Sequence, residues 1–259
     1  MNTSDPTNNP IQKLVGRYSS SRNHELNWGA GTLTLVFSNT GLLVSNNHLD
    51  SNIPEFQKHF AATEEISEVE LSPCLPSEAV LVHSSITTTL IAHASVTFYL
   101  AIPIYIKVTA ITQHERIIVA ELPLSFIKPA WYGDYASGET VVYQKVTSFS
   151  DAALDNINFA ICEVQLTNIT SGDLNINKIC IQTEYLALYQ KDFNFFATPL
   201  TITHKGGSEP SMIKVSATMP HGCTLQDRIA AARSDFKGFA RLRSLGRFLE
   251  FTGLKFLAE

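Results

Sequence analysis

The residues that could perform chemistry are dispersed along the chain rather than gathered in motifs. The eight histidines (positions 24, 48, 59, 83, 93, 114, 204 and 221) form no HxH or HxxxH pair, the spacings that place two metal ligands close together. The sequence also lacks GxSxG, HExxH, GxxxxGK[ST] and GxGxxG motifs. We therefore expect no catalytic residue, no bound metal and no cofactor. A metal-dependent enzyme with ligands from distant strands remains a third interpretation.

Two further sets of titratable residues favour structural roles. The acidic cluster Glu64, Glu65, Glu68 and Glu70 could pair carboxylates, but Glu68 and Glu70 alternate with apolar residues in "ISEVELS". This alternation predicts a solvated strand face. His83 and His93 lie in apolar runs, where we expect hydrogen-bonded core histidines.

The stretch "KPAWYGDYASGETVVYQKV" (128–146) offers a candidate ligand site. Flat rings can cover the apolar face of a sugar while a carboxylate accepts hydrogen bonds from its hydroxyls. The residues that would do so are Trp131, Tyr132, Asp134 and Tyr135. The competing interpretation is a structural corner, in which Trp131, Tyr132 and Tyr135 pack inside the protein. Pro129 would impose an extended approach and Gly133 would permit the turn.

Length and composition restrict the class of protein. A chain of 259 residues, 44% hydrophobic and 17% charged, can bury a core without disulfides or metals. At about 150 residues per domain it forms either one β-body or two β-subdomains divided near residues 65–80. The apolar stretch 79–106 contains Ser, Thr, His and Pro103, which favours buried strands over a membrane helix. Residues 1–16 lack the pattern of a signal peptide, so we expect a cytoplasmic location.

The four cysteines (Cys74, Cys162, Cys180 and Cys223) contain no CxxC pair, and we expect free thiols. Cys162 and Cys180 lie on neighbouring predicted strands, which we interpret as a hairpin across which the two thiols could face each other.

The body, residues 13–220, is predicted to be a mainly antiparallel β-sandwich that follows a disordered N-terminus (1–12). Apolar runs at 32–38 and 42–46 flank a turn and predict a hairpin. Further strand-like runs recur from 66 to 218 at spacings typical of antiparallel sheets. In "AICEVQLTN" every second residue is apolar, and in "LNINKICI" the apolar positions change parity, which predicts a bulge. A short helix is predicted at 53–65, because Pro54 suits a first turn and Phe56 and Phe60 are four apart.

The C-terminal segment, 221–259, differs from the body in charge and periodicity. It carries seven Lys or Arg against four Asp or Glu, a net charge of +3, while residues 1–220 have a net charge of −8. We predict an amphipathic helix over 224–252, bent near Gly238. Its first apolar face (Leu225, Ile229, Ala232, Phe236) would contact the body. The second face and its basic neighbours would contact a partner: Arg241, Leu242, Arg243, Leu245, Arg247, Phe248 and Leu249.

A family resemblance is carried by the segments "IPIYIKVTA", "LPLSFIKPAWYGDYASGETVVYQK", "CEVQLTNITSGDLNINKICI" and "ALYQKDFNFFATPLTIT". They resemble, over about residues 85–215, the uncharacterised prokaryotic family called domain of unknown function 432. In that family a strand leads into a corner of the type K-Y-A-L-Y-G. Residues 128–133 occupy this corner here, with Trp131 in place of a more usual aliphatic residue. The resemblance implies that the corner is part of the family scaffold, and it implies no activity.

The sequence thus predicts a mainly antiparallel β-sandwich with a short early helix and a C-terminal amphipathic helix. Its function would be that of a non-enzymatic binding or regulatory module. The expected partner of the C-terminal segment is a second copy of the chain or another protein, with an anionic membrane surface as the alternative. Nucleic acid is not expected, because the body is acidic and the basic cluster is short. The alternative function is a carbohydrate-binding or carbohydrate-processing β-protein that uses the aromatic corner at 129–138.

Overall fold

The structure is a computed structural model that describes residues 10–28, 31–49, 55–125, 127–133, 138–149, 158–206 and 211–234. These residues form eighteen β-strands, one short α-helix, α1 (Pro10–Leu14), and the 3-10 turns η2 (Thr183–Tyr185) and η3 (Leu225–Asp227). The predicted mainly β fold is therefore confirmed. No helix in this part of the chain is long and apolar enough to cross a membrane.

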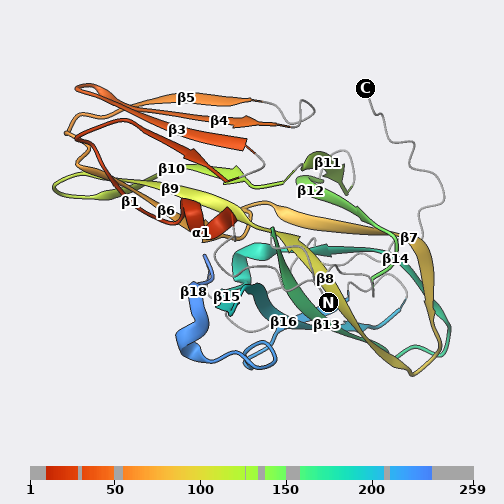
Figure 1. The fold of residues 1–259 in the computed structure, drawn as a ribbon. Helices are drawn as coiled ribbons and strands as arrows, with labels where there is room; N and C mark the ends of the chain where they lie inside the picture. The colour runs from red at the N-terminus through yellow and green to blue at the C-terminus, as the bar shows by residue number, and fades with distance from the viewer. Residues whose placement is uncertain are drawn as a thin grey trace, which may run out of the picture.

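The strands form four sheets, which stack in pairs as two sandwiches (Figure 1). In the first sandwich, one sheet has the order β2–β3–β4–β5 (His24–Asn27, Gly31–Ser38, Gly41–His48, Phe56–Ala61). Its other sheet has the order β1–β6–β9–β10 (Gly16–Ser19, Glu68–Cys74, Tyr105–Ile111, Arg116–Pro123).

The second sandwich contains the sheet β11–β12–β7–β14 (Lys128–Tyr132, Glu139–Val146, Ala79–Leu90, Leu174–Ile181). Opposite it lies the sheet β18–β15–β16–β13–β8 (Arg228–Ala230, Leu188–Lys191, Asn194–His204, Phe159–Asn168, Ser95–Pro103), with β17 (Met212–Val215) paired to β16. Most pairs are antiparallel as predicted, but β12 with β7 and β13 with β16 are parallel. The chain passes repeatedly between the sandwiches, and one cluster of buried apolar side chains extends through both.

Side-chain alternation explains the strands that the sequence predicts well. On β13 the four residues Ala160, Cys162, Val164 and Leu166 are completely buried. On β14 the register shifts between Ile176 and Lys178, which confirms the predicted bulge. The β3–β4 hairpin is confirmed too, and its turn ends at Gly41 with a φ of 149°. A Cβ atom at Gly41 would overlap the carbonyl oxygen of Phe60 on β5, so only glycine fits this approach.

The predicted helix at 53–65 is wrong, because its described residues include the strand β5, paired to β4. Phe56 and Phe60 are four residues apart, a spacing that shares one face in a strand as well as in a helix. Both rings pack against the core from β5. The free edge of β4 offers backbone hydrogen bonds, and sheet pairing therefore prevails over the local helical pattern.

The N-terminal boundary and the predicted β13–β14 hairpin also need correction. Residues 10–14 form α1, which buries Ile11 and Leu14, so the ordered body begins before Lys13. Strands β13 and β14 belong to different sheets, and the loop between them is an arch that joins the two layers of the second sandwich. Each strand has one apolar face, and the two faces pack against each other instead of pairing edge to edge.

The arch is held by the buried side chain of Asn168. Its amide nitrogen donates to the carbonyl oxygens of Leu90, Ile91 and Gly172, at 3.2, 3.3 and 2.8 Å. Its oxygen accepts from the backbone and hydroxyl of Thr170. Because β13 and β14 lie in different sheets, Cys162 and Cys180 do not face each other across a hairpin. All four cysteines are free thiols, as predicted, and all except Cys223 are buried.

The described part of the predicted C-terminal helix, residues 224–234, is not α-helical. A capping box is present, in which the Thr224 backbone nitrogen donates to the Asp227 carboxylate at 2.6 Å. However, the chain makes only the turn η3 and then continues as β18, antiparallel to β15. Leu225, expected to contact the body, is 63% exposed. The open edge of β15 accounts for this outcome because it satisfies the backbone of β18. The remainder of the predicted helix, with Gly238, lies outside the described residues.

Candidate functional site

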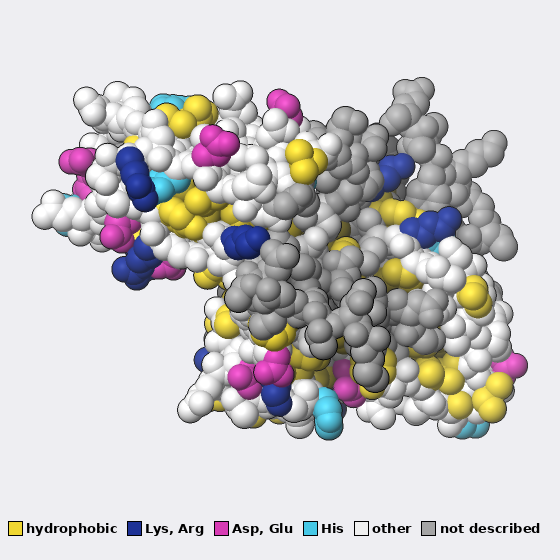
Figure 2. Space-filling view, viewed as in Figure 1, with side chains coloured by type: hydrophobic (Ala, Val, Ile, Leu, Met, Phe, Trp, Pro, Cys, Tyr) yellow, Lys and Arg dark blue, Asp and Glu magenta, His cyan; other side chains and the backbone are white. Residues whose placement is uncertain are grey.

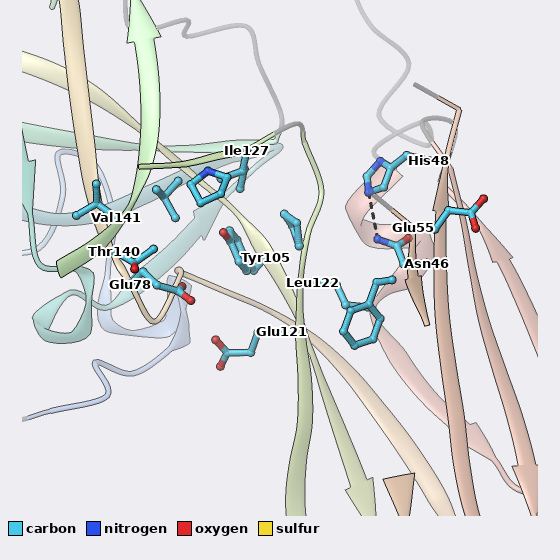
Figure 3. Close-up of a pocket in the computed structure, with 14 residues that line it drawn as sticks. Asn46, His48, Glu55, Glu78, Tyr105, Glu121, Leu122, Ile127, Thr140 and Val141 are labelled. Carbon is cyan, nitrogen blue, oxygen red and sulfur yellow. Dashed lines mark hydrogen bonds between the residues drawn. The ribbon is translucent and has the colours of Figure 1, made fainter. Parts of the chain in front are cut away.

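A cavity of about 320 Å³ lies where the two sandwiches meet. Its walls come from β4, β5, β9, β10, β11 and β12, that is, from three of the four sheets. Much of the wall is apolar and includes Phe56, Leu122, Ile127 and Val142. The lining also contains polar and charged residues, and Figure 3 shows Asn46, His48 and Glu55 on one side of the cavity and Glu78 and Thr140 on the other.

One end of the cavity is formed by Asn46 and His48, which face inward from β4. Both follow the buried residues Leu42 and Val44 at steps of two, so strand geometry places all four on one face. The Asn46 amide nitrogen lies 3.1 Å from His48 Nε2 (Figure 3). An amide NH₂ can only donate, so in this arrangement His48 Nε2 is the acceptor. The Asn46 oxygen then has no hydrogen-bond partner, although Asn46 is only 4% exposed.

The other end of the cavity is acidic and contains Glu78, Tyr105 and Glu121. Burial, together with the nearby Glu78 carboxylate, raises the pKa of Tyr105. Burial and the nearby Glu121 carboxylate also raise the pKa of the Cys74 thiol to about 12. Both groups therefore stay protonated at neutral pH, and neither serves as an activated nucleophile.

Glu121 is also bound from outside the cavity by Arg233. The guanidinium nitrogens Nη1 and Nη2 donate to the two carboxylate oxygens of Glu121 at 2.6 and 2.9 Å, and Nη2 also donates to the Leu75 carbonyl oxygen at 2.6 Å. The backbone nitrogens of Arg233 and Ser234 donate to the Glu184 carbonyl oxygen at 2.8 and 3.0 Å. Residues 221–234, which we call the C-terminal strap, contain no buried residue. Polar contacts of this kind, together with the pairing of β18 with β15, therefore hold the strap on the body.

Of the residues predicted to form the aromatic corner, the structure describes Trp131 and Tyr132, and these two differ in burial. Trp131 is 54% exposed on the edge strand β11, so the prediction that it packs inside is wrong. Tyr132 is half-buried and packs on a small cluster formed by Ala79, Leu81, Val141 and Cys180. Successive residues of a strand point to opposite faces, which explains why the two neighbours differ. Gly133 has a φ of 109° and makes the expected turn. Asp134 and Tyr135 lie outside the described residues.

The predicted partner-binding residues also lie outside the described part of the chain: Arg241, Leu242, Arg243, Leu245, Arg247, Phe248 and Leu249.

Two of the titratable groups singled out in the sequence have structural partners. Glu70, on the solvated face of β6, accepts hydrogen bonds from Arg17 at 3.1 Å and from Arg116 at 2.6 Å. Acidic and basic side chains are accordingly interspersed on the surface of the first sandwich (Figure 2). His83 is bonded to the Tyr143 hydroxyl at 2.8 Å, as expected, whereas His93 is exposed in a turn with a φ of 59°. Among the described residues no group of three or more His, Cys, Asp or Glu is placed to hold a metal ion.

The family model described as Protein of unknown function (DUF432) matches residues 16–246 of this sequence. The chain belongs to this family. The match begins at β1 and extends beyond β18, so it covers both sandwiches, the cavity and the C-terminal strap of this DUF432 protein. Comparison with curated proteins and with solved structures yields no significant match.

Sequence reasoning did not identify the cavity residues of this DUF432 protein. The sequence of β4 does contain a sign of these residues. In "LLVSNNH" the alternation that places Leu42 and Val44 on the inward face also places Asn46 and His48 there. Polar residues at positions that alternation assigns to the core are candidates for a buried site, because burying them without partners is costly. The acidic end has no such indication, since Glu78, Tyr105 and Glu121 come from separate segments.

Proposed function

We propose that this DUF432 protein is a non-enzymatic binding module whose ligand occupies the cavity between the sandwiches. The observation that carries the proposal is the cavity itself, about 320 Å³ in volume and lined by residues from three of the four sheets. Its volume is near the lower end of the usual range of about 300–1,000 Å³ for small-ligand sites, and its lining combines apolar surface with polar side chains that can orient a ligand.

Binding without catalysis is favoured by the protonation states at the acidic end. The raised pKa values of Tyr105 and Cys74 keep both groups in their protonated forms. Acyl or group transfer through these side chains would require the opposite shift.

A fragment screen observed by NMR tests the proposal. Thr140 is exposed at the rim of the cavity, and Thr140→Trp would close the mouth without entering the core. Thr97→Trp, at an exposed position on β8, is the matched control. We expect fragments that bind the wild-type protein and Thr97→Trp but not Thr140→Trp. Fragments that bind Thr140→Trp with unchanged affinity would contradict the proposal, as would a screen with no binders.

For the C-terminal segment we propose self-association, with a protein partner or an anionic membrane as the alternatives. Two features support this: the net charge of +3 over residues 221–259 and the basic cluster at Arg241, Arg243 and Arg247. Light scattering and liposome sedimentation of the full-length protein are compared with the triple Arg→Glu variant at these positions. We expect a wild-type dimer that the variant weakens. A monomer that sediments with anionic liposomes would favour the membrane, and a monomer that ignores them would refute both.

Carbohydrate binding remains a second candidate because Trp131 is exposed on an edge strand. The other tryptophan, Trp28, is buried, so a change in fluorescence on adding oligosaccharides would report mainly on Trp131. We would expect Trp131→Phe to abolish such a change. If wild-type fluorescence does not respond to glycans, this candidate is rejected.

A further inference from the structure

We infer that the C-terminal strap is a clasp that fixes the orientation of the two sandwiches and thereby the width of the cavity between them. The inference concerns regulation of the proposed binding site, and in that respect it rests on the proposed function. It follows from the way in which Arg233 joins the two sandwiches and from the position of Glu121 on the cavity wall.

The strap is fixed to the second sandwich by its backbone. Strand β18 pairs with β15 at the edge of that sandwich (Figure 1). Farther along the strap, the backbone nitrogens of Arg233 and Ser234 donate to the carbonyl oxygen of Glu184 in η2, between β14 and β15. The Ser234 hydroxyl also donates to the Glu184 carboxylate at 3.3 Å. These contacts make the strap part of the second sandwich.

One side chain extends from the strap to the first sandwich. The Arg233 guanidinium donates to both carboxylate oxygens of Glu121 on β10, and it also donates to the carbonyl oxygen of Leu75, directly after β6. Strands β6 and β10 belong to the same sheet of the first sandwich. Paired hydrogen bonds between a guanidinium and a carboxylate are stronger and more directional than bonds between neutral groups. Arg233 therefore joins the two sandwiches in addition to the chain segments that cross between them.

This contact is placed where it can act on the cavity. On β10, Glu121 is followed by Leu122 and Pro123, and all three line the cavity from the first sandwich. Thr140 and Val142 of β12 line it from the second. Because the cavity occupies part of the junction, the packing of side chains restrains the distance between these walls less than it would in a filled core. A contact that binds β10 to the second sandwich supplies the missing restraint.

The clasp can open without exposing either core. The side chains of Arg233 and Glu121 are 30% and 14% exposed, and no residue of the strap is buried, so opening uncovers little apolar surface. The apolar cluster that extends through both sandwiches keeps them joined. The motion is therefore a rotation of one sandwich against the other about the chain crossings, as in hinge movements of other proteins.

Residual dipolar couplings of the full-length protein, measured by NMR in a weakly aligning medium, test the clasp. When two parts of a protein keep a fixed orientation, their couplings fit a single alignment tensor. We expect this result for the wild-type protein and for Arg228→Gln, an exposed change in the same strap. In Arg233→Gln the couplings should still fit within each sandwich, which shows that both are folded, but the tensors of the two sandwiches should differ. Glu121→Gln should give the same difference, because it removes the charge that Arg233 binds.

The outcomes separate this inference from the proposed function. A single tensor for Arg233→Gln would overturn the clasp, even if fragments bind the cavity and Thr140→Trp blocks them. Different tensors in the wild-type protein would overturn it as well, because the clasp would then not fix the orientation. If the tensors differ only in Arg233→Gln and Glu121→Gln, the clasp is supported. If Thr140→Trp then changes the binding of no fragment, the proposed function fails while the clasp stands.

Discussion

Replacing Arg233 by Gln should release the C-terminal strap while the body stays folded. The change removes two hydrogen bonds to Glu121, at 2.6 and 2.9 Å, and one to the Leu75 carbonyl oxygen, at 2.6 Å. Glu121, whose side chain is only 14% exposed, would keep a poorly hydrated charge without its counterion. Since the strap contains no buried residue, only polar contacts would still hold it, chiefly the pairing of β18 with β15 and the backbone bonds to the Glu184 carbonyl oxygen.

The expected magnitude lies between those of exposed and buried ion pairs. Exposed pairs contribute about 0–1 kcal/mol, whereas removing one partner of a buried pair costs about 3–5 kcal/mol. The Arg233 side chain is 30% exposed, so we discount the buried figure to about 2 kcal/mol. A loss of this size corresponds to a change of about 30-fold in the equilibrium for opening the strap.

Hydrogen–deuterium exchange at single-residue resolution is the appropriate assay. The amides of positions 233 and 234, which donate to the Glu184 carbonyl oxygen, should exchange about 30-fold faster in Arg233→Gln, while amides of β13 stay protected. Arg228→Gln, an exposed change in the same strap, is the matched control. A double-mutant cycle with Glu121→Gln should give a coupling energy above about 1 kcal/mol. Unchanged exchange in Arg233→Gln, or a coupling energy near zero, would refute the reasoning.

Three further changes test the folding argument. Burial opposes ionisation of Glu70, but hydrogen bonds from Arg116 and Arg17 outweigh it and lower its pKa below 4.5. The stabilising contribution of the ionised Glu70 is therefore complete above pH 4.5 and is lost as the pH falls through its lowered pKa. Glu70→Gln should flatten this part of a plot of unfolding free energy against pH, and an unchanged plot would contradict the argument. Asn168→Ala should lower the free energy of unfolding in urea by about 3 kcal/mol, because it unties the arch, and a loss below about 1 kcal/mol would count against that role. Gly41→Ala should cost more than about 1 kcal/mol in the same assay, and a neutral result would refute the close approach of β5.

Alternation identified most strands of this fold, because a strand with one buried face carries its pattern in its own sequence. The sequence pattern gave a wrong prediction at Phe56 and Phe60, because a spacing of four residues suits both a helix and a strand. It also gave a wrong prediction at β18, because that segment pairs with the edge of β15, which is distant in the sequence. It also could not decide that β13 and β14 lie in opposite sheets. That choice depends on β7, β8 and β16, which are their actual partners.

The candidate site was less predictable than the fold for a related reason. Its polar groups come from segments that are far apart in the chain, and their convergence depends on how the two sandwiches meet. Only Asn46 and His48 leave a local trace, as polar residues on an inward strand face. The aromatic corner was conspicuous because of its composition, yet its most prominent ring, Trp131, is exposed on an edge strand.

Glu121 connects the cavity with the C-terminal strap, because the same carboxylate lines the first and binds Arg233 of the second. A cavity ligand that contacts the Glu121 carboxylate should therefore compete with Arg233 for it. By thermodynamic linkage, such a ligand should increase amide exchange at residues 233 and 234, and Arg233→Gln should change its affinity, whereas Arg228→Gln should not. If ligands of the cavity leave exchange in the strap unchanged and bind Arg233→Gln as they bind the wild-type protein, Glu121 takes no part in their recognition.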